Sequence, residues 1–159
     1  MASDRVIATL VALTVTASFP FYLHGARIVL TVERVTWDVL VRHLKVIAVG
    51  LTLTTVPMVT WMMPRLLAQL SGPAALHAVL GLQAYAMLVF ALTGIVRIFQ
   101  AKRAADLYCD PNPDVDLNDL HENMGAWRGR LRIGVFGYVV FWFLAWSLGV
   151  YRYLVRYVL

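Results

Sequence analysis

The sequence is dominated by four long apolar segments, each of the length that a helix needs to cross a membrane. They lie at 6–23, 46–63, 74–96 and 133–151; none contains Asp, Glu, Lys or Arg, and His77 is their only histidine. A helix of 18 residues rises about 27 Å, close to the thickness of a bilayer's hydrocarbon core, about 30 Å. The 159-residue chain is 60% hydrophobic and 14% charged, which is too little polar sequence to cover four such helices in a soluble domain. We therefore predict an all-α, polytopic membrane protein.

In this interpretation the whole chain is one integral membrane domain, a bundle of four transmembrane helices. The expected spans, with their polar ends, are about 6–25, 40–64, 74–98 and 131–152. An acidic loop at about 104–127 carries six Asp or Glu residues and no Lys or Arg. Apolar residues recur there at steps of three and four, which predicts an amphipathic cytoplasmic helix before the fourth span. The apolar stripe consists of Leu117, Leu120, Met124 and Trp127.

The basic residues predict the orientation of the bundle. Four of the 14 Lys and Arg residues belong to the terminal tails and the second loop, and ten belong to the first and third loops. The positive-inside rule then places both termini outside and the first and third loops in the cytoplasm, in a multi-pass protein of the cell membrane. Most of these cations lie near span ends, where lipid head groups explain them. The bilayer is thus the expected partner, and the basic patch of a nucleic-acid-binding protein is not found.

Two features predict how the helices pack. Pro57 lies inside the second span and should kink it. The same span carries Thr52, Thr55 and Thr60, whose hydroxyls should bond back to helix carbonyls or across to a neighbouring helix. In the third span, Gln83 and Tyr85 are possible partners for interhelical hydrogen bonds. The third span also carries small residues suited to a tightly packed face, namely Gly81, Ala84, Ala91 and Gly94.

Two histidines on the predicted cytoplasmic side, His24 and His43, are the candidate cofactor ligands. A short loop joins the first two spans, so these helices should pack antiparallel and hold the two rings at similar depth. Paired imidazoles from neighbouring helices are axial ligands of b-type haem. The alternative is that both are interfacial residues that bond to lipid phosphates or to the acidic loop. His121 lies on the same side and is a further candidate.

His77 stands at the other end of the bundle, about one turn inside the third span. Met62 approaches the same outer surface, and the two residue types together suit a soft copper or haem-iron site. The alternative is that His77 is an exposed histidine at a helix start and that Met62 serves in packing.

The sequence contains no motif of an established catalytic site. A nucleophile elbow, a phosphate-binding glycine loop, an HExxH motif and a cysteine pair are all missing. The single cysteine, Cys109, excludes a disulfide within the chain. The sequence therefore favours a protein without enzymatic activity but does not exclude an enzyme.

The segment DLHENMGAWRGRLRIGVFGY at 119–138, with the four spans and the acidic loop, resembles an uncharacterised family of small four-helix membrane proteins from haloarchaea. More distantly, Arg42-His43 at the start of the second span and His77 at the start of the third are similar to a bacterial four-helix family implicated in the assembly of haem-copper oxidases. This chain lacks that family's methionine shortly after the span-two histidine and its Pro-x-Trp in the last span. The second resemblance implies a role beside a respiratory complex, and neither family supplies a catalytic residue.

Together these observations lead to two functional hypotheses. The first is a small integral membrane component of a respiratory or electron-transfer complex, with haem b bound between spans one and two by His24 and His43. The second is a cofactor-free interaction or assembly protein that uses its acidic loop and the apolar stripe. In both, the expected partners are subunits of a membrane complex or further copies of this chain.

Overall fold

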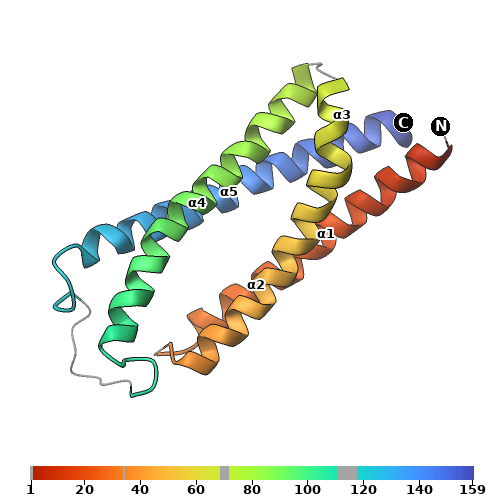
Figure 1. Ribbon diagram of the computed structural model, residues 1–159. Helices are drawn as coiled ribbons and strands as arrows, with labels where there is room; N and C mark the ends of the chain where they lie inside the picture. Colours follow the sequence, from red (N-terminus) through yellow and green to blue (C-terminus); the bar gives the residue numbers. More distant parts are fainter. Residues whose placement is uncertain (1, 34, 69–71, 111–117) are drawn as a thin grey trace.

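The computed structural model is all-helical over the residues that it describes, which are 2–33, 35–68, 72–110 and 118–159 (Figure 1). The helices follow one another along the chain and are joined by short connections and one longer loop before the last helix. In order they are α1 (Ala2–Leu30), α2 (Trp37–Pro57), the π-helical turn η1 (Met58–Met62), α3 (Met63–Ala68), α4 (Gly72–Ala104) and α5 (Met124–Tyr157).

Four of these helical segments are long and apolar enough to cross a membrane. They are Ser3–Leu30, Trp37–Arg65, Gly72–Ala104 and Met124–Tyr157. Large apolar side chains lie on their outward faces; Leu82 and Phe136, for example, are each 73% exposed. Such a surface is stable when lipid covers it. The predicted all-α bundle of four membrane helices is therefore confirmed.

The helices form two hairpins. α1 packs along α2, α4 packs along α5, and α1 also contacts α5. Both termini lie at one end of the bundle, together with the end of α3 and the start of α4, and we call this the terminal end (Figure 1). The end of α1, the start of α2, the end of α4 and the start of α5 lie at the opposite end, which we call the loop end.

Small residues let α4 and α5 approach closely. Ala91 is fully buried, and a Cβ added to Gly134 would lie 2.6 Å from the backbone nitrogen of Ala91. A Cβ added to Gly94 would collide with the carbonyl oxygen of Trp127. Three members of the predicted small-residue face, Ala84, Ala91 and Gly94, are thus packed as expected. Gly81 is not, because a Cβ added there would meet nothing within 4 Å.

Tyrosine and threonine hydroxyls join all four membrane helices near the middle of the bundle. Tyr138 on α5 donates to the Tyr22 hydroxyl on α1 at 3.0 Å, and Tyr22 bonds to Thr54 on α2 at 3.1 Å. Thr55 bonds across to Tyr85 on α4 at 2.7 Å, whereas Thr52 and Thr60 bond back to helix carbonyls, so both expected kinds of threonine hydrogen bond are present. Interhelical bonds of this kind contribute about 0.6 kcal/mol each on average inside a membrane.

An aromatic cluster closes the loop end. The backbone N–H of Trp37 donates to the Tyr108 carbonyl at 3.2 Å, and the rings of Trp37, Phe99 and Tyr108 lie within 5.5–6.3 Å of one another. Burial raises the pKa of the Tyr108 phenol, so this side chain stays neutral. The cluster therefore holds the start of α2 against the loop that follows α4.

The expected amphipathic helix before the fourth span is not a separate element in the described part of the loop. Residues 118–123 form turns, and α5 begins at Met124 and runs without a break to Tyr157. Of the apolar stripe, Met124 and Trp127 therefore lie in the first turn of the long helix itself, and Leu120 lies in the turn before it. That helix extends beyond the hydrophobic span because its first turns pack on α4.

Candidate functional site

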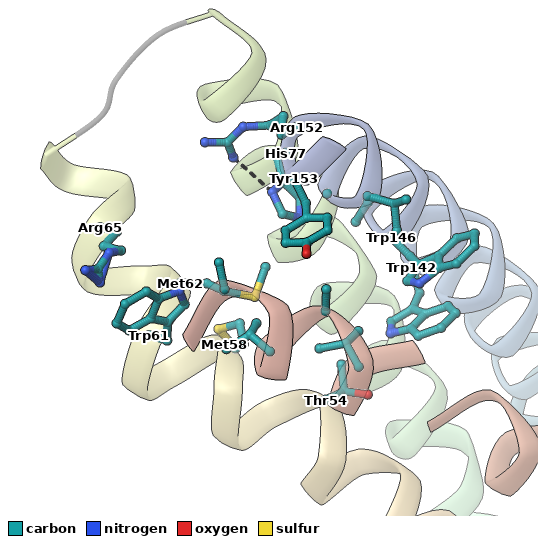
Figure 2. A pocket seen from close by; sticks show the side chains of 18 of the residues that line it. Thr54, Met58, Trp61, Met62, Arg65, His77, Trp142, Trp146, Arg152 and Tyr153 are labelled. Carbon is teal, nitrogen blue, oxygen red and sulfur yellow. Dashed lines mark hydrogen bonds between the residues drawn. The ribbon is translucent and has the colours of Figure 1, made fainter. Parts of the chain in front are cut away.

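A cavity of about 220 Å³ lies at the terminal end of the bundle, where all the helical segments contribute to its lining. Its wall is mainly apolar and aromatic, and a few polar side chains face it from several helices (Figure 2). Concave sites of this composition are typical of small-molecule binding.

The π-helical turn shapes one wall of the cavity. Pro57 has no N–H to donate, and directly after it the helix widens until the Met63 N–H reaches the carbonyl oxygen of Met58, five residues back. This turn carries Met58, Trp61 and Met62, which line the cavity. The disturbance predicted at Pro57 is thus confirmed, and it directs two thioethers and an indole into the site.

The opposite wall carries a pair of polar side chains. Arg152 Nη1 on α5 lies 3.1 Å from His77 Nδ1 on α4 (Figure 2). A guanidinium is only a donor, so Nδ1 accepts this hydrogen bond and the neutral imidazole carries its proton on Nε2. Gly149 makes room for the ring, because a Cβ at this position would lie 3.1 Å from His77 Cε1. His77 is therefore half-buried and bonded to a neighbouring helix, unlike an exposed histidine at a helix start.

A second arginine lies at the edge of the cavity. Arg65 stacks over Trp61, with its guanidinium carbon 3.2 Å from the ring centroid, and pairs with Asp4 of α1 at 2.6 Å. Both side chains of this ion pair are partly exposed, at 37% and 45%. The pair links α3 to α1, and the Asp4 carboxylate compensates the positive charge of Arg65.

Hydrogen bonds to α1 hold the rest of the wall. The Tyr153 hydroxyl bonds to Thr9 at 2.8 Å, and Trp146 Nε1 donates to Thr16 at 3.1 Å. Thr54 and Tyr85, whose hydroxyls belong to the interhelical bonds described above, lie at the inner end of the cavity. The polar atoms of the wall are therefore mostly bonded to one another, which keeps the shape of the site fixed.

The structure brings His77 and Met62, the predicted metal pair, to the same cavity (Figure 2). Because His77 Nδ1 accepts from Arg152, Nε2 carries the ring proton, and His77 could bind a metal ion only if this hydrogen bond were broken. Within the described ranges, no group of three or more His, Cys, Asp or Glu side chains is placed to hold a metal ion. A site made by His77 and Met62 stays a prediction.

The histidines of the loop end have different surroundings. His43 Nδ1 bonds to the backbone carbonyl of Gly25 at 2.8 Å, so α2 meets α1 next to His24, whose own side chain is exposed. His121 accepts a bond from the Asn123 N–H at 3.0 Å and lies against Trp127, with ring centroids 4.4 Å apart. His43 and His24 thus come from adjacent points of two antiparallel helices, whereas His121 belongs to the turn before α5.

The predicted interaction stripe is divided by the fold. Met124 is 1% exposed and belongs to the interior, so its proposed contact with a partner is corrected to a structural role. Leu120 and Trp127 are partly exposed at the loop end, and Leu117 lies outside the described residues. The interaction surface therefore reduces to Leu120 and Trp127 in the part of the loop that the structure describes.

Sequence reasoning missed most of the residues that form the cavity. Nothing in the sequence indicates that Arg152 or the tryptophans of the last span line a cavity. One signal was present: Met58, Trp61 and Met62 follow Pro57 at steps of three and one, which places them on one helix face. Nothing in the sequence indicates that this face lies opposite His77.

The chain was compared with known families, curated proteins and solved structures. A family model described as a domain of unknown function, DUF7321, matches residues 4–158 and so includes all four membrane helices. No curated protein and no solved structure matches the chain. This protein therefore belongs to the DUF7321 family.

Proposed function

We propose that this protein binds an amphiphilic small molecule of the membrane in the cavity at its terminal end. The observation that carries the proposal is the composition of the cavity wall, in which the apolar residues Met58, Met62 and Trp146 face the polar pair Arg152 and His77. A ligand with an apolar body and a polar end satisfies both parts of this wall. Binding, rather than catalysis, is the role that such a wall supports.

The size of the cavity limits what it holds. Its volume of about 220 Å³ is below the range of about 300–1,000 Å³ that is usual for sites of drug-sized ligands. The cavity therefore suits the polar end of a ligand with a ring or a short length of chain, and the remainder of a longer ligand extends along the helices. With the predicted orientation, the ligand enters from the outer side of the membrane.

Tryptophan fluorescence tests this proposal directly. Three of the five tryptophans, Trp61, Trp142 and Trp146, line the cavity, and Trp37→Phe with Trp127→Phe removes the other two. A spin-labelled stearic acid methyl ester, added to protein in phosphatidylcholine nanodiscs, should quench the remaining fluorescence in a saturable way. Unsaturable quenching, as from free diffusion in the bilayer, would contradict the proposal.

A glycine offers a matched pair of control variants. Gly81 lines the cavity and has open space around its missing Cβ, so Gly81→Leu should fill the site without disturbing the packing. Gly129 also has open space but lies outside the cavity, so Gly129→Leu should leave the quenching unchanged. Equal loss in both variants would indicate a general effect of the added side chain.

A second candidate function, electron transfer through a b-type haem, is favoured by one contact. The bond between His43 Nδ1 and the Gly25 carbonyl fixes the tautomer and leaves Nε2 as the ligand atom, an arrangement that orients many metal-bound histidines. His43 therefore fits the role of an axial ligand, with the exposed His24 as the predicted second one. Haem bound there would supply a one-electron redox centre to a respiratory complex.

Absorption spectra separate the two candidates. Protein purified from cells supplied with haem should show Soret and alpha bands in a reduced-minus-oxidised spectrum if His24 and His43 bind haem. The bands should be lost in His43→Ala and kept in His77→Ala. A spectrum without these bands in the unmodified protein would remove the haem hypothesis and leave ligand binding in the cavity untouched.

A further inference from the structure

The charges at the terminal end are strongly unbalanced. The segments that meet there supply four arginines but a single acidic residue, Asp4, which already pairs with Arg65. The arginines are Arg5, Arg65, Arg152 and Arg156. Three of them, all but Arg5, line the cavity. The end of the protein that contains the cavity is therefore rich in hydrogen-bond donors and poor in negative charge.

Arg152 is the cation with the clearest unused binding capacity. A guanidinium has five N–H donors in a fixed plane, and the structure uses one of them for His77 Nδ1. Over the described ranges of the chain, Arg152 has no carboxylate partner. Arginine binds carboxylate and phosphate groups through paired N–H donors, and such charge-assisted bonds are about twice as strong as neutral ones.

His77 orients this guanidinium. Its imidazole is held against α5 by the close approach to Gly149, and its Nδ1 accepts from Arg152 without contributing a negative charge. The charge of the arginine therefore stays available, which would not be so if an Asp or Glu stood at position 77. A neutral acceptor that positions an arginine beside an apolar wall is the arrangement that an anionic, chain-bearing ligand requires.

We propose that the ligand of this cavity is an anionic amphiphile whose carboxylate or phosphate head group is bound by Arg152, with His77 as the positioning residue. The apolar part of the ligand lies along Met58, Met62 and Trp146. This inference rests on the proposed function and specifies the chemical class of its ligand.

The test uses two probes that differ only in charge. Spin-labelled stearic acid and its methyl ester carry the same chain and label, and at about pH 9 the acid is ionised even where a bilayer raises its pKa. In phosphatidylcholine nanodiscs, the acid should quench the cavity tryptophans at a concentration about tenfold lower than the ester does, a difference of about 1.4 kcal/mol.

Arg152→Gln should abolish the preference for the acid over the ester, and an unchanged helical circular dichroism spectrum shows that the variant is folded. Arg5→Gln removes an equal charge at the same end from a residue outside the cavity, and it should leave the preference for the acid intact. Equal weakening in both variants would mean that the surface charge attracts the acid, and it would overturn the inference.

The positioning role of His77 is tested separately, because removal of its side chain also changes the wall of the cavity. His77→Ala should reduce the preference for the acid, and His77→Gln should restore most of it, since the Gln side-chain oxygen can accept from Arg152. Restoration by Gln separates positioning of the guanidinium from simple filling of space. Equal preference in Ala and Gln variants would contradict the positioning role.

Two further arms identify the source of the head group. Spin-labelled phosphatidic acid should be preferred over spin-labelled phosphatidylcholine if a lipid phosphate is bound. Displacement of the acid probe by inorganic phosphate would show that a free anion suffices, and both results support the anion site. Equal affinity for the acid and the ester overturns the inference but not ligand binding, whereas no saturable binding of either probe overturns both.

Discussion

The two ends of this bundle use their polar side chains in different ways. At the loop end, two histidines bond to the backbone: His43 bonds to the carbonyl of Gly25, and His121 bonds to the N–H of Asn123. At the terminal end, side chains of different helices bond to each other around a cavity, as Arg152 does with His77. The first pattern closes turns and hairpins, and the second leaves donors available to a ligand.

This difference shows why the position of a histidine in the sequence is a weak guide to its role. His43 is a candidate haem ligand because His24 is expected at a similar depth, yet one of its ring nitrogens already bonds α2 to the backbone of α1. His77 stands alone in its segment, yet it holds an arginine beside a cavity lined by aromatic side chains. The hydrogen-bond partner of each imidazole therefore distinguishes a link between helices from a role in a binding site.

The largest expected effect comes from filling the tight contact between α4 and α5. Gly134→Leu should destabilise the protein by about 3 kcal/mol, the upper end of overpacking costs, because its Cβ would lie 2.6–2.7 Å from the backbone of Ala91. Gly81→Leu, beside the cavity, should change the stability by less than about 1 kcal/mol. Thermal unfolding in detergent, followed by circular dichroism, measures both, and equal effects would contradict the contrast between packed and open regions of α4.

The next effect sharpens the structural role of the loop end. His43→Ala should destabilise the protein by about 1 kcal/mol, the usual net contribution of one hydrogen bond, because the contact with the Gly25 carbonyl is lost. His24→Ala, whose side chain is exposed, should stay within about 0.5 kcal/mol of the unmodified protein. Equal midpoints for the two variants would show that the His43 bond does not stabilise the α1–α2 hairpin.

A smaller effect is expected where the two hairpins meet. Tyr138→Phe removes the donor to Tyr22 and should cost about 0.6 kcal/mol, the average for such bonds in membrane proteins. Tyr151→Phe is the matched control, because Tyr151 is 59% exposed. A destabilisation several times larger in Tyr138→Phe would mean that the hydroxyls linking α5, α1 and α2 act as one cooperative network.

The smallest effect concerns the ion pair at the terminal end. Asp4→Asn should cost less than about 1 kcal/mol, because both partners of the pair with Arg65 are partly exposed. The loss should shrink further in high salt, which screens exposed charges. Glu33→Gln removes an equal charge at the loop end, where the residue is exposed, and serves as the control. A large, salt-insensitive loss in Asp4→Asn would indicate that the pair holds the terminal end together.

Several local features could be predicted because their causes lie within one helix. Pro57 disturbs its own helix through its missing N–H, and small residues such as Ala91 and Gly94 mark a packed face wherever the partner lies. That threonines of the second span bond to helix carbonyls or to a neighbouring helix was also predicted, but the pairing of Thr55 with Tyr85 was not. Gly81 was misplaced because its sequence signal is identical to that of the packed glycines.

The candidate site could not be predicted, because its parts are far apart in the chain. The residues that define it, Met62, His77 and Arg152, come from three helices. Their proximity depends on how far the two hairpins separate at the terminal end, and this separation is not encoded in any single segment. The same reason explains Met124, whose burial depends on contacts with the rest of the bundle.

The sequence by itself determined that four helices are long and apolar enough to cross a membrane, since length and hydropathy are properties of each segment alone. It also determined where the second of them departs from regular geometry, because proline acts on its own backbone. Only the tertiary structure decided that Arg152 meets His77 beside a cavity, because that contact depends on the relative placement of α4 and α5. Local physics specifies the helices of this protein, and the packing between them specifies its candidate site.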